Sequence, residues 1–294
     1  MGELLYVRHA RLVIHRLEIT GLRMAFQIER SIKKEPNTAE LRVWNLNRDH
    51  QAQLQEQGVI PVRLEAGYLK PSILLSTGTE AALAGIGLEP PGPADLPLLF
   101  QGELRQAFTG REGSDLVTTI SSGDGEKKRQ RQRTKLSFRP GLRLRKIIQD
   151  LASAAGVGLG NALSAIDGIA DLEITTGVAS QGPALEQLEQ MLEGAGFETS
   201  VQNGDLQVLG AGKALRGTAV LLNEETGLVG SPEPGQDGKV KARCLLRPGV
   251  EPGRRVKLES RFVAGHYRVE KYRAVGDTHG TDWYNELELG RIAA

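Results

Sequence analysis

Hydrophobic and polar residues alternate through most of both ends of the chain, a pattern typical of β-strands. The first strand is expected over Val13–Ile19, with Val13, His15 and Leu17 on one face and the residues between them on the other. Further N-terminal strands are expected over Met24–Glu29, Ala39–Trp44, Val59–Gly67, Leu98–Phe108 and Leu116–Ser121. The first part of the chain is therefore predicted to be a β unit.

Turn and cap residues divide these strands. Asn47 is placed to cap a short helix over Arg48–Gln57, and Gly58 is placed to end it. Residues 71–97 are rich in Gly, Ala, Ser and Pro and interrupt a hairpin. We interpret residues 71–97 as an inserted surface loop.

The middle of the chain changes to a helical period. Apolar residues share one face of Leu142–Ala155, which Gly156 should end, and a second helix is expected over Pro183–Ala195. Three glutamates of the second helix, Glu186, Glu189 and Glu193, are expected on its solvent side. Asn203-Gly204 then predicts a tight hairpin between two short strands. Residues 140–210 should thus form a small α/β unit.

A second β unit follows. Its strands are expected over Thr218–Thr226, Lys239–Leu246, Arg254–Ser260, Gly265–Ala274 and Asp282–Leu289, with a loop over Gly230–Gly238. The predicted fold class is α+β and mainly β, in three domains. They are a first barrel-like β domain over residues 1–135, a small α/β domain over 136–212, and a second barrel-like β domain over 213–294.

Composition narrows the function classes. The 294 residues carry a formal net charge of +1, so no overall attraction to nucleic acid or anionic membranes is expected. Cys244 is the single cysteine, which excludes an intrachain disulfide and cysteine-based metal clusters. It lies in an apolar run and is expected in the core. We expect no signal peptide, no membrane anchor and no cofactor.

Three candidate catalytic or binding sites are better explained as ordinary turns or as an exposed helix face. Asp277 and His279 lack a third metal ligand at a recognised spacing, so we expect a turn in which Asp277 accepts backbone N–H groups and Gly280 takes a positive φ. Ser121–Gly125 lacks the Lys and the following helix of a phosphate-binding loop, so we expect a turn at a strand end. The solvated glutamates of the second helix lack the burial that a general acid needs.

The basic segment is the remaining candidate contact. It comprises Lys127, Lys128, Arg129, Arg131, Arg133 and Lys135. Four of these cations fall at every second position and would share one face of a strand. Three interpretations are open: a solvated loop, contact with an acidic neighbour in an assembly, or contact with a nucleic-acid backbone. No aromatic residue interleaves with the segment, so base stacking is not supported.

Short motifs in a fixed order resemble one known family. In the N-terminal half they are NTAELRVWNLN at Asn37–Asn47, VRLEAGY at Val62–Tyr68, LFQGEL at Leu99–Leu104, ISSGDG at Ile120–Gly125 and LSFRPG at Leu136–Gly141. In the C-terminal half they are Gly227–Pro232, Leu245–Gly253, Val256–Ser260, Gly265–Val269 and Gly276–Tyr284. Together they resemble the baseplate hub family of contractile-tailed phages and related injection systems. Residues 71–97 exceed the length of the usual hairpin.

The resemblance implies a structural part and no enzyme. Family members form a trimer around a channel, with two tail-tube-like barrel domains in each subunit. The implied partners are a second and third copy, the spike protein, the tail tube protein or tube initiator, baseplate wedge proteins, a tape-measure protein and DNA in transit. The implied location is the virion tail, after synthesis in the host cytoplasm.

Three other functions stay open from the sequence. One is a different tail component with a related barrel, such as a distal tail or tube-initiator protein. Another is a cell-wall hydrolase associated with the tail, although no acid–base pair stands out. The last is an independent nucleic-acid-binding module, which depends on the basic segment alone.

Overall fold

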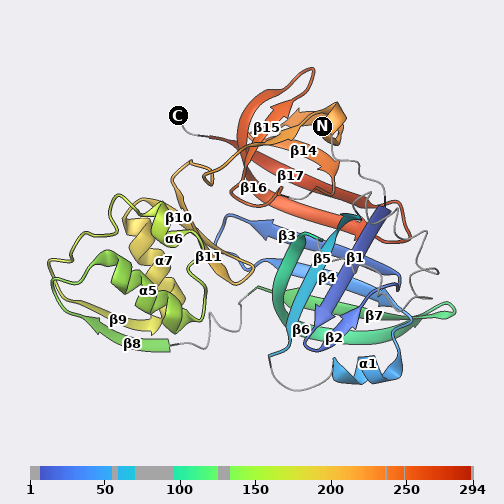
Figure 1. The fold of residues 1–294 in the computed structure, drawn as a ribbon, viewed down its shortest axis with the longest axis horizontal. Helices are drawn as coiled ribbons and strands as arrows, with labels where there is room; N and C mark the ends of the chain where they lie inside the picture. Colours follow the sequence, from blue (N-terminus) through green and yellow to red (C-terminus); the bar gives the residue numbers. More distant parts are fainter. Residues whose placement is uncertain are drawn as a thin grey trace, which may run out of the picture.

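A single large sheet dominates the structure, a computed structural model that describes residues 7–54, 59–69, 96–124, 133–235, 237–247 and 249–292 (Figure 1). Its N-terminal strands are β1 (Val7–Ile14), β2 (Leu17–Ile19), β3 (Met24–Ser31), β4 (Thr38–Trp44), β5 (Pro61–Leu69), β6 (Leu98–Glu112) and β7 (Asp115–Gly123). Its C-terminal strands are β12 (Val220–Leu222), β13 (Leu228–Pro234), β14 (Val240–Leu245), β15 (Arg255–Glu259), β16 (Ala264–Asp277) and β17 (Trp283–Arg291). The expectation of a mainly β fold is confirmed.

The two ends of the chain meet in the middle of this sheet. Its strand order is β13-β14-β17-β16-β3-β4-β7-β6-β5-β1-β2, with β15 beside β16 and β12 beside β15. The described pairs are antiparallel except β12 with β15. Strand β16 pairs with β3 from Lys271↔Ser31 to Asp277↔Ala25. Both β units therefore share one hydrogen-bonded sheet and one hydrophobic core.

The remaining elements form a smaller unit beside the sheet (Figure 1). They are β8 (Arg133–Phe138), α5 (Leu144–Ala155), α6 (Ala162–Ala165), β9 (Val178–Pro183), α7 (Ala184–Gly194), β10 (Phe197–Gln202) and β11 (Asp205–Gly210). A second core cluster lies inside this unit and includes Ile147, Leu151 and Leu188, each fully buried. The boundary expected after residue 135 falls within β8, which pairs with β9.

Several local predictions are confirmed by the structure. Ala39, Leu41 and Val43 point from β4 into the core, as the alternation predicts. Asn47 caps α1 (Arg48–Gln53) by accepting the His50 N–H at 2.8 Å, although the helix ends earlier than expected. Gly58 and most of the expected loop over 71–97 lie outside the described residues.

Helix α5 ends at Gly156, which has the left-handed backbone expected of a C-terminal glycine. The turn between β10 and β11 has positive φ at both Asn203 and Gly204, as its sequence predicts. Cys244 is buried in the sheet core, as expected.

The prediction of one continuous strand over Val13–Ile19 is wrong. The chain turns at His15, which has a φ of 53°, so β1 ends at Ile14 and β2 begins at Leu17. Leu12, Ile14, Leu17 and Ile19 are buried, because the turn shifts the alternation by one position.

Three other expectations need correction. The segment expected to be a loop from Gly230 is mostly strand β13, which pairs with β14. The strand expected over Thr218–Thr226 is limited to β12, followed by a single 3-10 turn, η1 (Glu224–Thr226). Glu189 of α7 is buried and only 3% exposed, whereas the sequence pattern places it in solvent.

Candidate assembly surfaces

The basic segment lies only partly within the described structure. Lys127, Lys128, Arg129 and Arg131 fall outside the described residues. Arg133 opens β8, and Lys135 lies exposed on the same strand. The contact role of this segment stays a prediction.

Opposite charges cross four neighbouring strands on the outer face of the sheet. Arg243 of β14 and Arg273 of β16 both reach Glu286 of β17, at 2.7 and 2.8 Å. Arg273 also lies 3.7 Å from Glu29 of β3, and Lys271 lies 3.6 Å from the same carboxylate. A groove of about 690 Å³ follows this face. We call these five side chains the charge ladder; it joins residues from both ends of the chain.

The groove along the charge ladder is electrostatically balanced, since four cations and four glutamates line it: Lys241, Arg243, Lys271, Arg273, Glu29, Glu233, Glu286 and Glu288. Partial burial alone would raise the pKa of Glu286, but hydrogen bonds from Arg243 and Arg273 outweigh it and hold that pKa below its usual range. The carboxylate therefore stays ionised at neutral pH. Each exposed pair of this kind stabilises the fold by about 0.2–1 kcal/mol. The main effect of the ladder is to cancel the charge of its arginines.

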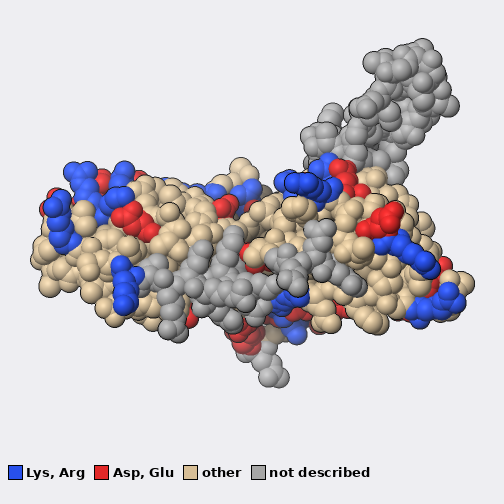
Figure 2. Space-filling view, turned by 90° about the horizontal axis from the view of Figure 1, so that it is seen from below, with Lys and Arg blue, Asp and Glu red and all other residues tan. Residues whose placement is uncertain are grey.

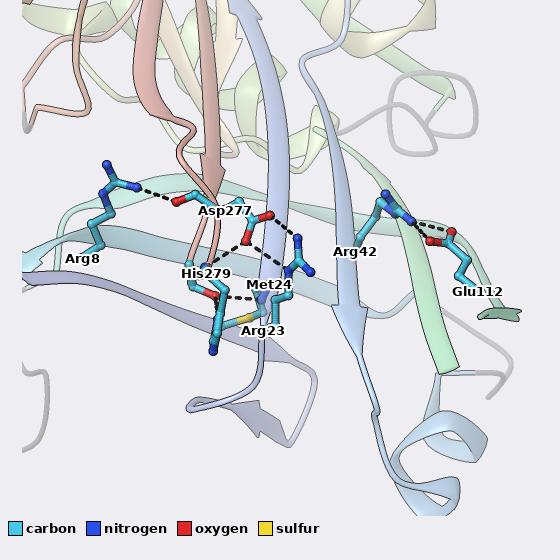
Figure 3. A network of polar contacts seen from close by, with 9 residues as sticks. Arg8, Arg23, Met24, Arg42, Glu112, Asp277 and His279 are labelled. Carbon is cyan, nitrogen blue, oxygen red and sulfur yellow. Dashed lines mark hydrogen bonds and ion pairs between the residues drawn. The ribbon is translucent and has the colours of Figure 1, made fainter. Parts of the chain in front are cut away.

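The Asp277–Gly280 corner is a hydrogen-bonded turn (Figure 3). The Asp277 carboxylate accepts the His279 N–H at 2.9 Å and the Arg23 guanidinium at 2.8 Å. Arg8 donates to the Gly280 carbonyl at 2.9 Å. The predicted turn is confirmed, but Gly280 does not take a positive φ. Among the described residues, no three potential metal ligands of the His, Cys, Asp or Glu type gather at one place.

Arg23 connects this corner to the Trp44 ring. Arg23 and Arg42 lie over the Trp44 ring, with their guanidinium carbons 4.3 and 4.9 Å from its centroid. Arg42 also forms an ion pair with Glu112 on the β6 arm of the β6–β7 hairpin (Figure 3). Because these cations already stack on Trp44, the ring is part of a closed network rather than an open base-stacking platform.

A buried polar cluster, missed by the sequence reasoning, fastens the small unit to the sheet. Asn37, 3% exposed, is the last residue of the β3–β4 loop. Its side-chain amide donates to the Val201 carbonyl at 2.8 Å and to Gln202 Oε1 at 3.2 Å, both in β10. Its Oδ1 accepts the Ser31 N–H at 3.1 Å. One side chain thus satisfies backbone groups on both sides of the junction.

A buried ionisable pair completes this cluster. Asp124, the residue after β7, accepts the Gly204 N–H of the β10–β11 turn at 3.1 Å and the Asn37 amide at 3.3 Å. Arg30 donates to Gln202 at 3.2 Å. Burial raises the pKa of Asp124 to about 6, against the opposing effects of Asn37 and Arg30. The sequence predicts the turn at 203–204 but contains no signal for where it docks.

A second junction contact lies at the edge of a groove of about 900 Å³. Arg268 of β16 donates to Glu198 of β10 at 2.6 Å and to the Lys213 carbonyl at 3.2 Å. It also forms an ion pair with Glu270 at 3.1 Å. Arg268 is 7% exposed, so these bonds compensate for the burial of its charge. The small unit is thus held at two places.

Comparison with models of protein families shows to which family the chain belongs. The sequence model of the family described as baseplate hub gp41 matches residues 20–288. The chain belongs to this baseplate hub family. The resemblance drawn from the short motifs is confirmed, and the chain is a component of the phage tail baseplate. No curated protein matches the chain.

Solved structures of tail proteins share the hub fold. A 43 kDa tail protein of prophage MuSo2 from Shewanella oneidensis is 10% identical, with a TM-score of 0.61 over 97% of this chain and 98% of its own. A tail protein from Neisseria meningitidis is 9% identical, with a TM-score of 0.62 over 97% and 96%. The c3393 protein of E. coli, a type VI secretion component similar to T4 tail proteins gp27 and gp5, is 8% identical, with a TM-score of 0.58 over 96% and 77%. These likenesses concern the fold.

The hub assignment places the chain among structural tail proteins. Its structural neighbours come from phage tails and from a type VI secretion system, and they share its fold. In the part of the chain that the structure describes, no helix has the length and apolar character to span a membrane.

Proposed function

We propose that three copies of this chain form a ring that joins the tail tube to the central spike. The charge ladder is the observation that supports this proposal, since it runs unbroken from β14 to β3 across both β units. Two β units in each of three subunits provide six similar positions for a hexameric tube. The proposal assigns residues 1–135 and 213–294 to two tube-like barrel domains and residues 136–212 to a small peripheral domain.

The outer sheet face is the proposed wall of a channel for DNA. Binding of DNA by a protein grows with the number of cations that replace counterions on the phosphates. Arg243 and Arg273 already bind Glu286, so they offer little to a passing phosphate. A balanced wall of this kind suits passage better than retention.

The proposed partners are the spike protein, the tail tube protein or a tube initiator, wedge proteins and a tape-measure protein. The basic segment is a further proposed contact with the channel or an acidic partner. Changing Arg129, Arg131 and Arg133 to Glu is expected to block particle assembly while the subunit still folds. Infective tails from this triple variant would contradict that contact.

Solution mass is the first test of the ring. Three chains of 31.8 kDa give about 95 kDa by light scattering, measured alone and with the neighbouring spike protein. Images of the trimer should then show a central channel. A monomer in both conditions would contradict the ring, and a hexamer would indicate a tube initiator or distal tail protein instead.

A further inference from the structure

Strand β8 has a partner on only one side. It pairs with β9 from Arg133↔Pro183 to Phe138↔Val178, and among the described residues the two strands form a sheet of their own. Figure 1 shows β8 at the outer border of the small unit, away from the large sheet. Its second edge therefore presents backbone groups to its surroundings.

The register indicates which groups these are. Proline has no N–H, so the Arg133↔Pro183 pair fits a position without mutual hydrogen bonds. In an antiparallel ladder such positions alternate, which assigns Lys135 and Ser137 to the same class. Their N–H and C=O groups then point to the free edge. Both residues are exposed.

The surroundings of this edge are basic. Lys135 on β8 and Arg139 just after it are exposed, and neither forms an ion pair within the described structure. Arg145, nearby in sequence, forms an ion pair with Asp171 at 3.2 Å, and both side chains are well exposed. Figure 2 shows Lys and Arg side chains gathered toward the outer end of the small unit. The free edge therefore favours an anionic ligand.

We propose that β8 accepts an acidic, extended segment of another tail protein as an added third strand. A protein segment matches both features, because its backbone can continue the ladder while acidic side chains at alternate positions meet Lys135 and Arg139. A nucleic acid can meet the charges but has no backbone donors and acceptors in strand register. The proposal goes beyond the ring, since it applies to a monomer or a trimer.

The test compares two short labelled peptides of alternating Thr and Glu on the full chain, by fluorescence anisotropy. One has a normal backbone, and the other carries N-methyl groups at every second residue, which keep the charge but block ladder bonds on one edge. We expect the normal peptide to bind at least about tenfold more tightly. Equal binding of the two peptides, no binding at millimolar concentration, or tighter binding of duplex DNA would overturn the proposal.

Variants locate the site. Ser137→Pro removes an N–H that the β8–β9 ladder does not use, so it should abolish peptide binding while the melting temperature stays near that of the Ser137→Ala control. Lys135→Glu should weaken binding about tenfold through charge alone. Unchanged binding by both variants would overturn the proposal. If the chain is a trimer but binds no peptide, only this inference fails, and if a monomer binds the peptide, only the ring fails.

Discussion

Replacing Asn37 with Ala should loosen the junction between the small unit and the sheet. The change removes the donor to the Val201 carbonyl and the acceptor of the Ser31 N–H, which are bonded at 2.8 and 3.1 Å. Asp124 also loses a hydrogen bond that now offsets its burial. A buried group left without a partner costs about 1–3 kcal/mol. Two such groups set the expected loss at about 3 kcal/mol.

Hydrogen exchange measures this loss where it occurs. Amides of β10 and β11 should exchange about a hundredfold faster, since each 1.4 kcal/mol corresponds to a factor of ten. Amides in the centre of the sheet should change much less, because the two units have separate hydrophobic cores. Trp44 and Trp283 both lie in the sheet, so tryptophan fluorescence during urea unfolding reports the stability of the sheet alone.

Matched variants make the result decisive. Gln106→Ala removes an exposed amide from β6 and should change neither exchange nor unfolding. Asn37→Asp places a second carboxylate beside Asp124, so its effect should exceed that of Asn37→Ala at pH 7 and shrink at pH 5. Acceleration below tenfold, or equal acceleration throughout the sheet, would refute the reasoning about the junction.

Other changes test the remaining chemistry. Because the folded chain raises the pKa of Asp124 from 3.8 to about 6, wild-type stability should fall by up to about 3 kcal/mol as pH rises through this range, and Asp124→Asn should remove that dependence in urea titrations. Leu188→Ala should cost about 2–5 kcal/mol and lower the urea midpoint of the small unit. Glu286→Gln should change stability by less than about 1 kcal/mol but give the outer face salt-sensitive affinity for duplex DNA, as titration at two salt concentrations would reveal.

The sequence patterns correctly predicted those helices, strands and turns that depend mainly on residues close together in the chain. Strand β4 alternates cleanly because one face meets the core and the other meets solvent. Helix α5 has an apolar stripe and a glycine at its end, and the β10–β11 turn has the residues that positive φ requires. The motif order also predicted the family, since it preserves spacing that single motifs lack.

The predictions failed where contacts between residues far apart in the sequence determine the structure. β13 contains Gly and Pro and resembles a loop, yet β14 supplies its ladder partner. Glu189 follows a helical surface pattern, but the packing of the small unit buries it. Asn37 and Asp124 occupy ordinary turn positions, and only docking of the β10–β11 turn makes them a junction. No periodic pattern in the sequence indicates these contacts between distant segments.

The order of folding connects these observations to assembly. Contacts inside the small unit are close in sequence, as in the β10–β11 hairpin, and such contacts form quickly. The charge ladder instead needs Arg273 beside β3, and the Arg273–Gln27 hydrogen bond spans 246 residues of sequence. The ladder therefore exists only after nearly all of the chain has been made and the sheet has closed through β16 and β3. Since the proposed channel wall is this same face, only a chain complete through β17 can present it, and the proposed ring would therefore select subunits that have been fully made.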